Sequence, residues 1–189
     1  MYSRIEIGGF TNKLFRSRGG IYIPGQSLFL SRKNNVLAIL NGPEGKRVIG
    51  ARNIVTDAGD LHYAQRGANE APTNAFAVQI MATAGTPGKT ATDDDFTAIA
   101  ASEKAHFAAY PQTNDGDGDN TGAGVDIVTW LVSYTKADFN DTAITHGIIT
   151  NTSPGVTEPL LTGYAFASSF AKTADDTLKV FVNHEMLGV

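Results

Sequence analysis

The chain contains no cysteine, so it can form neither disulfides nor thiolate-based metal sites. It also has no long apolar run, since no segment approaches the ~18 apolar residues of a membrane-spanning helix. The first twenty residues contain no apolar stretch of the kind found in secretory signals. These absences favour assembly in a reducing cytoplasm and predict no membrane partner.

Sequence motifs of common enzyme classes are missing too. There is no Walker A, G-x-G-x-x-G or G-x-S-x-G motif. The four histidines (His62, His106, His146 and His184) lie in separate stretches without a shared spacing. His184 continues an apolar strand face, which predicts a hydrogen-bonded residue at the core margin rather than a ligand. We expect a protein that is not an enzyme, with a spatially assembled Ser-His-Asp site as the alternative.

What the chain has instead is short apolar runs of strand length, separated by turn residues that include many of its 20 glycines. Three such runs lie between Ala143 and Val189. From Thr177 to His184 apolar and polar residues alternate, and Phe181 alone breaks the polar side. The apolar side is Leu178, Val180 and Val182, and the polar side is Thr177, Lys179 and Asn183. This pattern predicts an antiparallel sheet with one face on the core.

Two segments interrupt the strand pattern. Asp57 is expected to cap a helix of two to three turns that ends near Gly67. Phe96–Tyr110 is rich in alanine and would be a helix by propensity, but it has no apolar helical stripe, so two short strands fit equally well. Nearer the N-terminus, Asn34-Asn35 is expected to form a hairpin turn between two apolar runs.

Charge divides the chain into two parts. Residues 1–52 hold nine basic and two acidic side chains, a net charge of +7, whereas the remainder holds six basic and seventeen acidic, a net charge of −11. We expect a basic N-terminal arm or hairpin at residues 1–51 and a folded body at 52–189. Alternatively, the arm folds back on its own acidic body.

The basic arm is expected to bind a partner. Its aromatic residues would suit single-stranded nucleic acid, but the acidic remainder argues against nucleic acid as the main partner. An acidic protein surface fits better, with strand addition supplying backbone hydrogen bonds. The expected partner-binding residues are Arg16, Arg18, Tyr22, Leu28, Leu30, Arg32, Lys33, Lys46 and Arg47.

An acidic stretch, Asn114–Asn120, places carboxylates at alternate positions, a spacing that lets them converge on a hard cation such as Ca²⁺. The candidate metal ligands are Asp115, Asp117, Asp119 and Asp126. They match positions 1, 3, 5 and 12 of an EF-hand loop, but Asn replaces the usual glycine and Asp replaces the closing glutamate. Apart from this possible Ca²⁺, we expect no cofactor, and the alternative is a solvated loop between strands.

Five stretches of the second part, taken together, resemble a recurring β-rich module of tailed-phage virion proteins. They are RNIVTDAGDLHYAQRGA, PTNAFAVQIMATAGTPGK, AITHGIIT, EPLLTGYAFA and DDTLKVFVNHEMLGV. The resemblance covers about residues 52–189 and implies a virion component without catalytic residues. Similar proteins include capsid decoration (cement) proteins, head–tail accessory proteins and tail or fibre components.

The resemblance implies an antiparallel β-sandwich, jelly-roll-like, with one short helix and an extended N-terminal arm. We expect a dimer or trimer that decorates the major capsid protein shell of a virion assembled in the host cytoplasm. A tail, fibre or head–tail accessory protein is one alternative. A calcium-dependent binding module is another.

Overall fold

The computed structural model describes residues 6–7, 10–11, 35–106, 108, 111–114, 127–151 and 157–185. Strands β1 (Glu6–Ile7) and β2 (Phe10–Thr11) pair with each other. The other described strands are β3 (Asn35–Gly42), β4 (Gly45–Val55), β5 (Val78–Gly85), β6 (Phe96–Ala98), β7 (Lys104–Ala105), β8 (Gln112–Asn114), β9 (Ile127–Tyr134), β10 (Asp141–Thr150), β11 (Leu160–Lys172) and β12 (Thr177–Glu185).

These ten strands form one antiparallel sheet in the order β6-β5-β10-β11-β4-β3-β12-β9-β8, with β7 also paired to β5. The prediction of an all-β antiparallel fold with a single short helix among the described residues is confirmed. Because the strands form one continuous sheet, the jelly-roll detail of that prediction is not confirmed.

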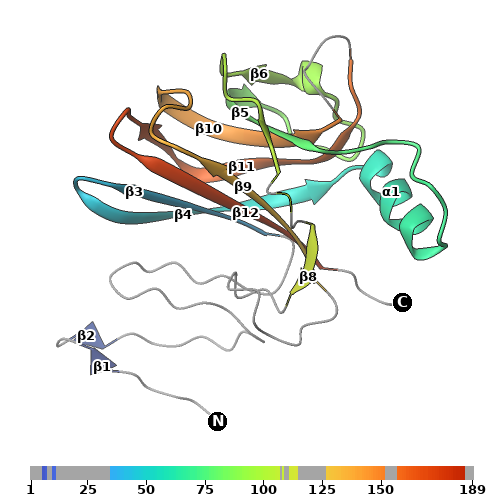
Figure 1. Ribbon diagram of the computed structural model, residues 1–189, viewed down its shortest axis with the longest axis horizontal. Coiled ribbons are helices and arrows are strands. Elements are labelled where there is room, and N and C mark those ends of the chain that lie inside the picture. The colour runs from blue at the N-terminus through green and yellow to red at the C-terminus, as the bar shows by residue number, and fades with distance from the viewer. Residues whose placement is uncertain are drawn as a thin grey trace.

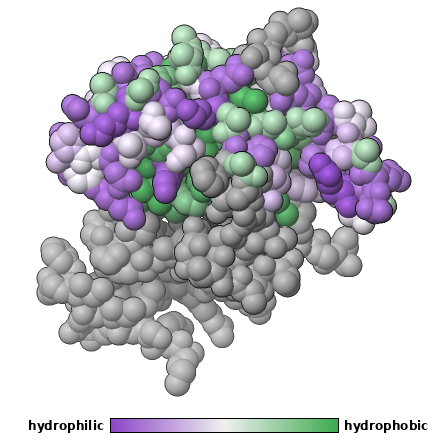
Figure 2. Space-filling model, viewed as in Figure 1, coloured by the Kyte–Doolittle hydropathy of each residue, from purple (hydrophilic) through white to green (hydrophobic). Residues whose placement is uncertain are grey.

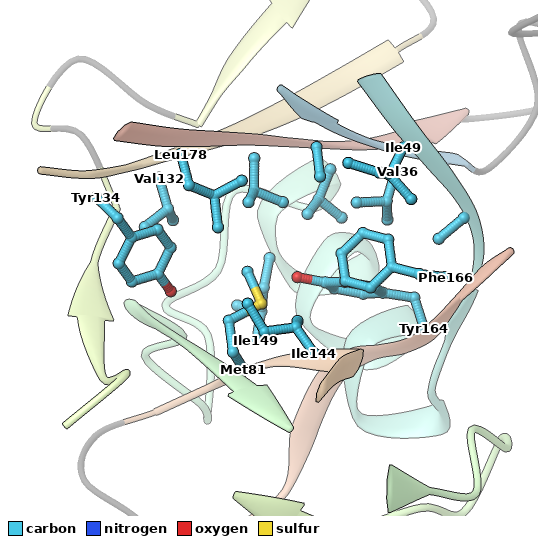
Figure 3. Packing of buried hydrophobic residues seen from close by; sticks show 14 of the residues in the cluster. Val36, Ile49, Met81, Val132, Tyr134, Ile144, Ile149, Tyr164, Phe166 and Leu178 are labelled. Carbon is cyan, nitrogen blue, oxygen red and sulfur yellow. The ribbon is translucent and has the colours of Figure 1, made fainter. Parts of the chain in front are cut away.

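The sheet curls so that its two halves face each other across the core (Figure 1). Figure 3 shows the two sides of the core. Val36, Val132 and Leu178 point from β3, β9 and β12 toward residues of β5 and β10. Met81, Ile144 and Ile149 face them from the other side. The core is therefore enclosed by a single sheet, as in a half-barrel.

The two ends of the curled sheet approach each other between β7 and β9. The Nζ atom of Lys104 in β7 lies 2.6 Å from Oδ1 of Asp138, just beyond β9. Next to it, the rings of His106 and Trp130 meet edge to face with centroids 5.3 Å apart. We refer to this junction as the seam.

Strand β3 lies in the middle of the sheet, paired with β4 on one side and β12 on the other. Its Val36 and Ala38 are fully buried. Asn35, expected in a turn, begins the strand and pairs with Arg52 and Asn183. The boundary expected at Arg52 therefore falls inside β4, and the sheet includes residues 35–51. The reason is that this hairpin supplies one alternate-residue face to the core.

Strands β6 and β7 decide between the two interpretations of Phe96–Tyr110 in favour of two short strands, as far as that stretch is described. The segment between them is held to β5, since the Ile99 amide donates to the Met81 carbonyl at 2.8 Å. The Ser102 hydroxyl also contacts the Met81 backbone. Pairing with β5 thus outweighs the helix propensity of the alanines.

Helix α1 (Asp57–Gly67) ends where the sequence predicts, but its cap is Thr56 rather than Asp57. The Thr56 hydroxyl accepts from the Gly59 amide at 3.1 Å, which satisfies one free donor of the first turn. Asp57 instead lies in that first turn, where its charge favours the helix dipole. The described part of the chain contains no helix long and apolar enough to cross a membrane.

Candidate functional site

A cluster of titratable and aromatic side chains lies where α1 meets the seam. Helix α1 presents Tyr63 to the core and a hydrophilic side to solvent (Figure 2). Its first turn fits closely against β11, because a Cβ atom at Gly59 would collide with the carbonyl oxygen of Leu161. The Thr56 hydroxyl donates to the Leu160 carbonyl, and the Thr56 amide donates to the Leu161 carbonyl at 3.1 Å. The helix is therefore fixed against the sheet at one point.

A chain of hydrogen bonds runs from β9 through α1 to β12. Trp130 donates from Nε1 to the Tyr63 hydroxyl at 2.9 Å, and this hydroxyl lies 2.5 Å from Nδ1 of His184. Indole N–H can only donate. The Tyr63 hydroxyl can therefore donate its proton to Nδ1 of His184. This requires the His184 tautomer that carries its own proton on Nε2. We call these three residues the Trp–Tyr–His chain.

Burial keeps the two titratable groups of the Trp–Tyr–His chain, Tyr63 and His184, neutral. His184 is 0% exposed, and desolvation lowers its pKa to about 3. Desolvation raises the pKa of Tyr63 well above its usual range, with the bond from Trp130 opposing. Among the described residues, Nε2 of His184 has no hydrogen-bond partner. A neutral imidazole bonded to a neutral phenol can hold α1 in place, but it offers no charged group to a ligand.

Two more histidines, His62 and His106, contact the Trp–Tyr–His chain. His62 donates from Nδ1 to the Asn74 carbonyl at 3.0 Å, which ties the loop after α1 to the helix, and desolvation lowers its pKa. Its ring packs against Phe76, with centroids 5.3 Å apart. His106 meets Trp130 from the side of β7. Three of the four histidines thus gather around Tyr63 and Trp130, although their sequence spacing gave no sign of it.

A cluster of three charged side chains lies in the other part of the seam: Lys104, Asp138 and Lys172. The hydrogen bond from Lys104 is the main cause that lowers the pKa of Asp138 to about 2. Lys172 is buried, and its Nζ donates to the Asp138 carbonyl at 3.3 Å. Desolvation lowers the pKa of Lys172, while the charges of Asp138 and Asp176 oppose that shift. These contacts join β7 to the loop between β9 and β10 and to the end of β11.

The predicted metal ligands Asp115, Asp117, Asp119 and Asp126 lie outside the described residues. In the part of the chain that the structure describes, no three or more His, Asp or Glu residues gather as a metal site would require. Asp93–Asp95 forms a 3-10 turn, in which the Asp95 carboxylate accepts a hydrogen bond from the Thr92 amide at 2.9 Å. The calcium hypothesis stays a prediction.

Of the predicted partner-binding residues, only Lys46 and Arg47 are described. Both lie at the start of β4, next to the β3–β4 turn, and Lys46 is exposed. Arg47 is close enough to Asp176 for its charge to help lower the pKa of that carboxyl, after the hydrogen bonds from Thr173. Seven other predicted residues lie outside the described residues: Arg16, Arg18, Tyr22, Leu28, Leu30, Arg32 and Lys33.

His184 was predicted to be a hydrogen-bonded residue at the core margin, and the structure confirms this. Tyr63 was not predicted as its partner, because contacts between a helix and a distant strand leave no periodic signal in the sequence.

Comparisons of the chain with protein-family models, with curated proteins and with solved structures found no match.

Proposed function

We propose that this chain is a non-enzymatic structural protein of a tailed-phage virion, which decorates the capsid shell and holds it through the basic segment before β3. One observation carries the proposal. The segment joins the sheet at Asn35, the first residue of the interior strand β3. Because β3 is hydrogen-bonded on both sides, a pull on the segment is resisted by two ladders of backbone bonds.

The charge distribution supports attachment to an acidic surface. With the sheet starting at Asn35, residues 1–34 hold six basic and one acidic side chain, a net charge of +5. Residues 35–189 hold nine basic and eighteen acidic side chains, a net charge of −9. A basic arm steers the protein toward an acidic shell, and acidic bodies repel one another once they are attached.

Lys46 and Arg47 lie away from the point where the arm joins the sheet. Lys46 and Arg47 lie near the β3–β4 turn, whereas Arg32 and Lys33 precede the opposite end of β3. Eight residues of strand separate the two ends by about 23 Å. We assign the main attachment to the arm, through Arg16 and Arg18, and treat Lys46 as a separate, peripheral contact.

The first test is the number of copies in purified virus particles, measured by quantitative mass spectrometry. Hundreds of copies per particle support decoration of the shell. A handful of copies would place the protein in the tail or at the head–tail junction, and complete absence would overturn the virion proposal. Binding to tail-less empty shells separates the shell from the tail as the docking surface.

A charge-reversal pair tests the arm itself. The double variant Arg16→Glu and Arg18→Glu should lower occupancy on shells at least about tenfold, because each reversed charge meets an acidic surface. Lys136→Glu is the matched control, since Lys136 is an exposed cation of the body and its reversal should leave occupancy unchanged. Full occupancy by the double variant, or equal loss in the control, would contradict attachment through the arm.

A further inference from the structure

The outer face of the sheet carries an apolar cluster away from the core. It consists of Leu37, Ile39, Val48, Leu131 and Phe181, and we call it the outer patch. Leu37, Phe181 and Leu131 are direct neighbours across β3, β12 and β9. Val48 and Ile39 are paired in the row beside them. Phe181, the residue that breaks the polar side of its strand, lies at the centre of this patch.

Three of the five residues of the outer patch are buried even though the patch faces away from the core. Leu37, Val48 and Phe181 are 3%, 6% and 8% exposed. Beside them on the same face, Thr129 and Asn183 are 0% and 5% exposed, and the Thr129 hydroxyl donates to Asn183 Oδ1 at 2.7 Å. All residues of the cluster come from β3, β4, β9 and β12 themselves, and no other described element contributes to it.

The opposite half of the sheet shows how this chain covers such a face. Ile80, Ile148 and Leu160 form a second apolar cluster off the core, which includes Ala91 and Phe96 from the segment that follows β5. The Phe96 ring lies on Gly163 so closely that a Cβ atom there would be 2.7 Å from it. There, a neighbouring stretch of the same chain provides the cover.

We propose that the outer patch is the docking site of the chain's own residues 21–34. This segment runs directly into β3, which forms part of the patch. The C-terminal end of the segment therefore starts beside the patch. It holds the apolar runs Ile21–Ile23 and Leu28–Leu30. In an extended segment Leu28 and Leu30 point to the same side and Phe29 to the other, so these two leucines pack on the patch.

Tethering and charge favour this occupant over a second copy or a foreign partner. A segment joined to the patch by the peptide bond before Asn35 is present there at a high effective concentration, whatever the protein concentration. Its Arg32 and Lys33 carry positive charge toward a body of net charge −9. An uncovered apolar sheet face, by contrast, would expose the protein to aggregation.

Docking of residues 21–34 on the outer patch does not require a virion partner. It divides the arm into an apolar half that folds on the body and a basic half, residues 1–20, with Arg4, Lys13, Arg16 and Arg18 left for a partner. Tyr22, Leu28 and Leu30 then contact the body rather than a capsid. Loss of particle binding and loss of patch coverage are separate results, because coverage is measured on the purified protein alone.

A single reporter cysteine tests the docking. The natural chain has no cysteine, and Val48→Cys changes side-chain size little. The measurement is the rate at which iodoacetamide alkylates the introduced thiol under native conditions. Removal of residues 1–34 should raise this rate at least about tenfold, because the thiol becomes accessible without local opening. The double variant Leu28→Ser and Leu30→Ser should raise it similarly.

Two controls make each outcome decisive. Phe29→Ser should leave the rate unchanged, because its side chain points away from the patch. A reporter at Lys179, exposed in the same row of the sheet, should react equally fast with and without residues 1–34. Protection that survives the deletion would assign the patch to another segment, and protection lost on dilution would assign it to a second copy. Either result, or a thiol at position 48 that reacts freely in the full chain, overturns the proposal.

Discussion

The hydroxyl of Tyr63 lies 2.5 Å from Nδ1 of His184, although 121 residues separate the two in the sequence. The same hydroxyl accepts a hydrogen bond from Trp130. One side chain of α1 thereby satisfies polar groups of two neighbouring strands that are otherwise packed in the apolar core. The arrangement attaches the only described helix to the sheet, and it should be visible in the stability of the protein.

Tyr63→Phe should lower the free energy of unfolding by about 1–3 kcal/mol, because it leaves Nε1 of Trp130 and Nδ1 of His184 buried without a partner. Chemical denaturation at pH 7 measures the change. Tyr134→Phe is the matched control: among the described residues the buried Tyr134 hydroxyl has no hydrogen-bond partner, so its loss should be neutral or stabilising. Equal losses in both variants would contradict the role of the Trp–Tyr–His chain.

The buried His184 should make stability depend on pH. Folding lowers its pKa from an ordinary 6.5 to about 3, so the unfolded state binds more protons between these values. The free energy of unfolding should therefore fall as the pH drops below 6.5, with a slope approaching about 1.4 kcal/mol per pH unit. Denaturation between pH 7 and 4 measures the slope.

His184→Gln should flatten this dependence. His62 and His146 act in the same direction, because desolvation lowers the pKa of each, but both are less buried than His184. His146→Gln is therefore the comparison variant, and it should change the slope less. An unchanged slope in the His184 variant would show that other groups govern the acid sensitivity.

The ion pair at the seam should couple its two partners. A double-mutant cycle of Lys104→Ala and Asp138→Asn should give a coupling energy of about 0.5–1 kcal/mol, because the pair is only partly screened by solvent, with side chains 36% and 21% exposed. The pair of Lys89 and Asp60 is the control. Its side chains are 54% and 57% exposed, and its coupling should be close to zero.

Two N-terminal deletions locate the start of the folded body. Removal of residues 1–34 should leave a cooperative thermal transition at a lower melting temperature, since the sheet is intact but the outer patch is uncovered. Removal of residues 1–51 should abolish the transition, because it takes away β3 and most of β4 and so breaks the sheet between β11 and β12. A cooperative transition in the longer deletion would restore the boundary expected at Arg52.

The alternation of Leu178, Val180 and Val182 identified a core-facing strand, and the structure confirms it, because a period of two is a local property of extended backbone. The end of α1 at Gly67 was predictable for a similar reason. The cap at Thr56 was not, since two adjacent residues can both cap and the contact of Thr56 with Leu160 decides between them. Phe181 looked like an exception to its strand, and only the register with Leu37 and Leu131 reveals the outer patch.

Periodicity and charge are local properties of a chain, so they were enough to predict the all-β class, the antiparallel strands near the C-terminus and the contrast between a basic beginning and an acidic remainder. Pairing between distant segments was needed to place β3 inside the sheet, to form two strands within Phe96–Tyr110 and to bring His184 to Tyr63. The physical reason is that each of these outcomes depends on which distant segments pair. The free energy of such pairing comes from burial and hydrogen bonds between segments that share no local pattern.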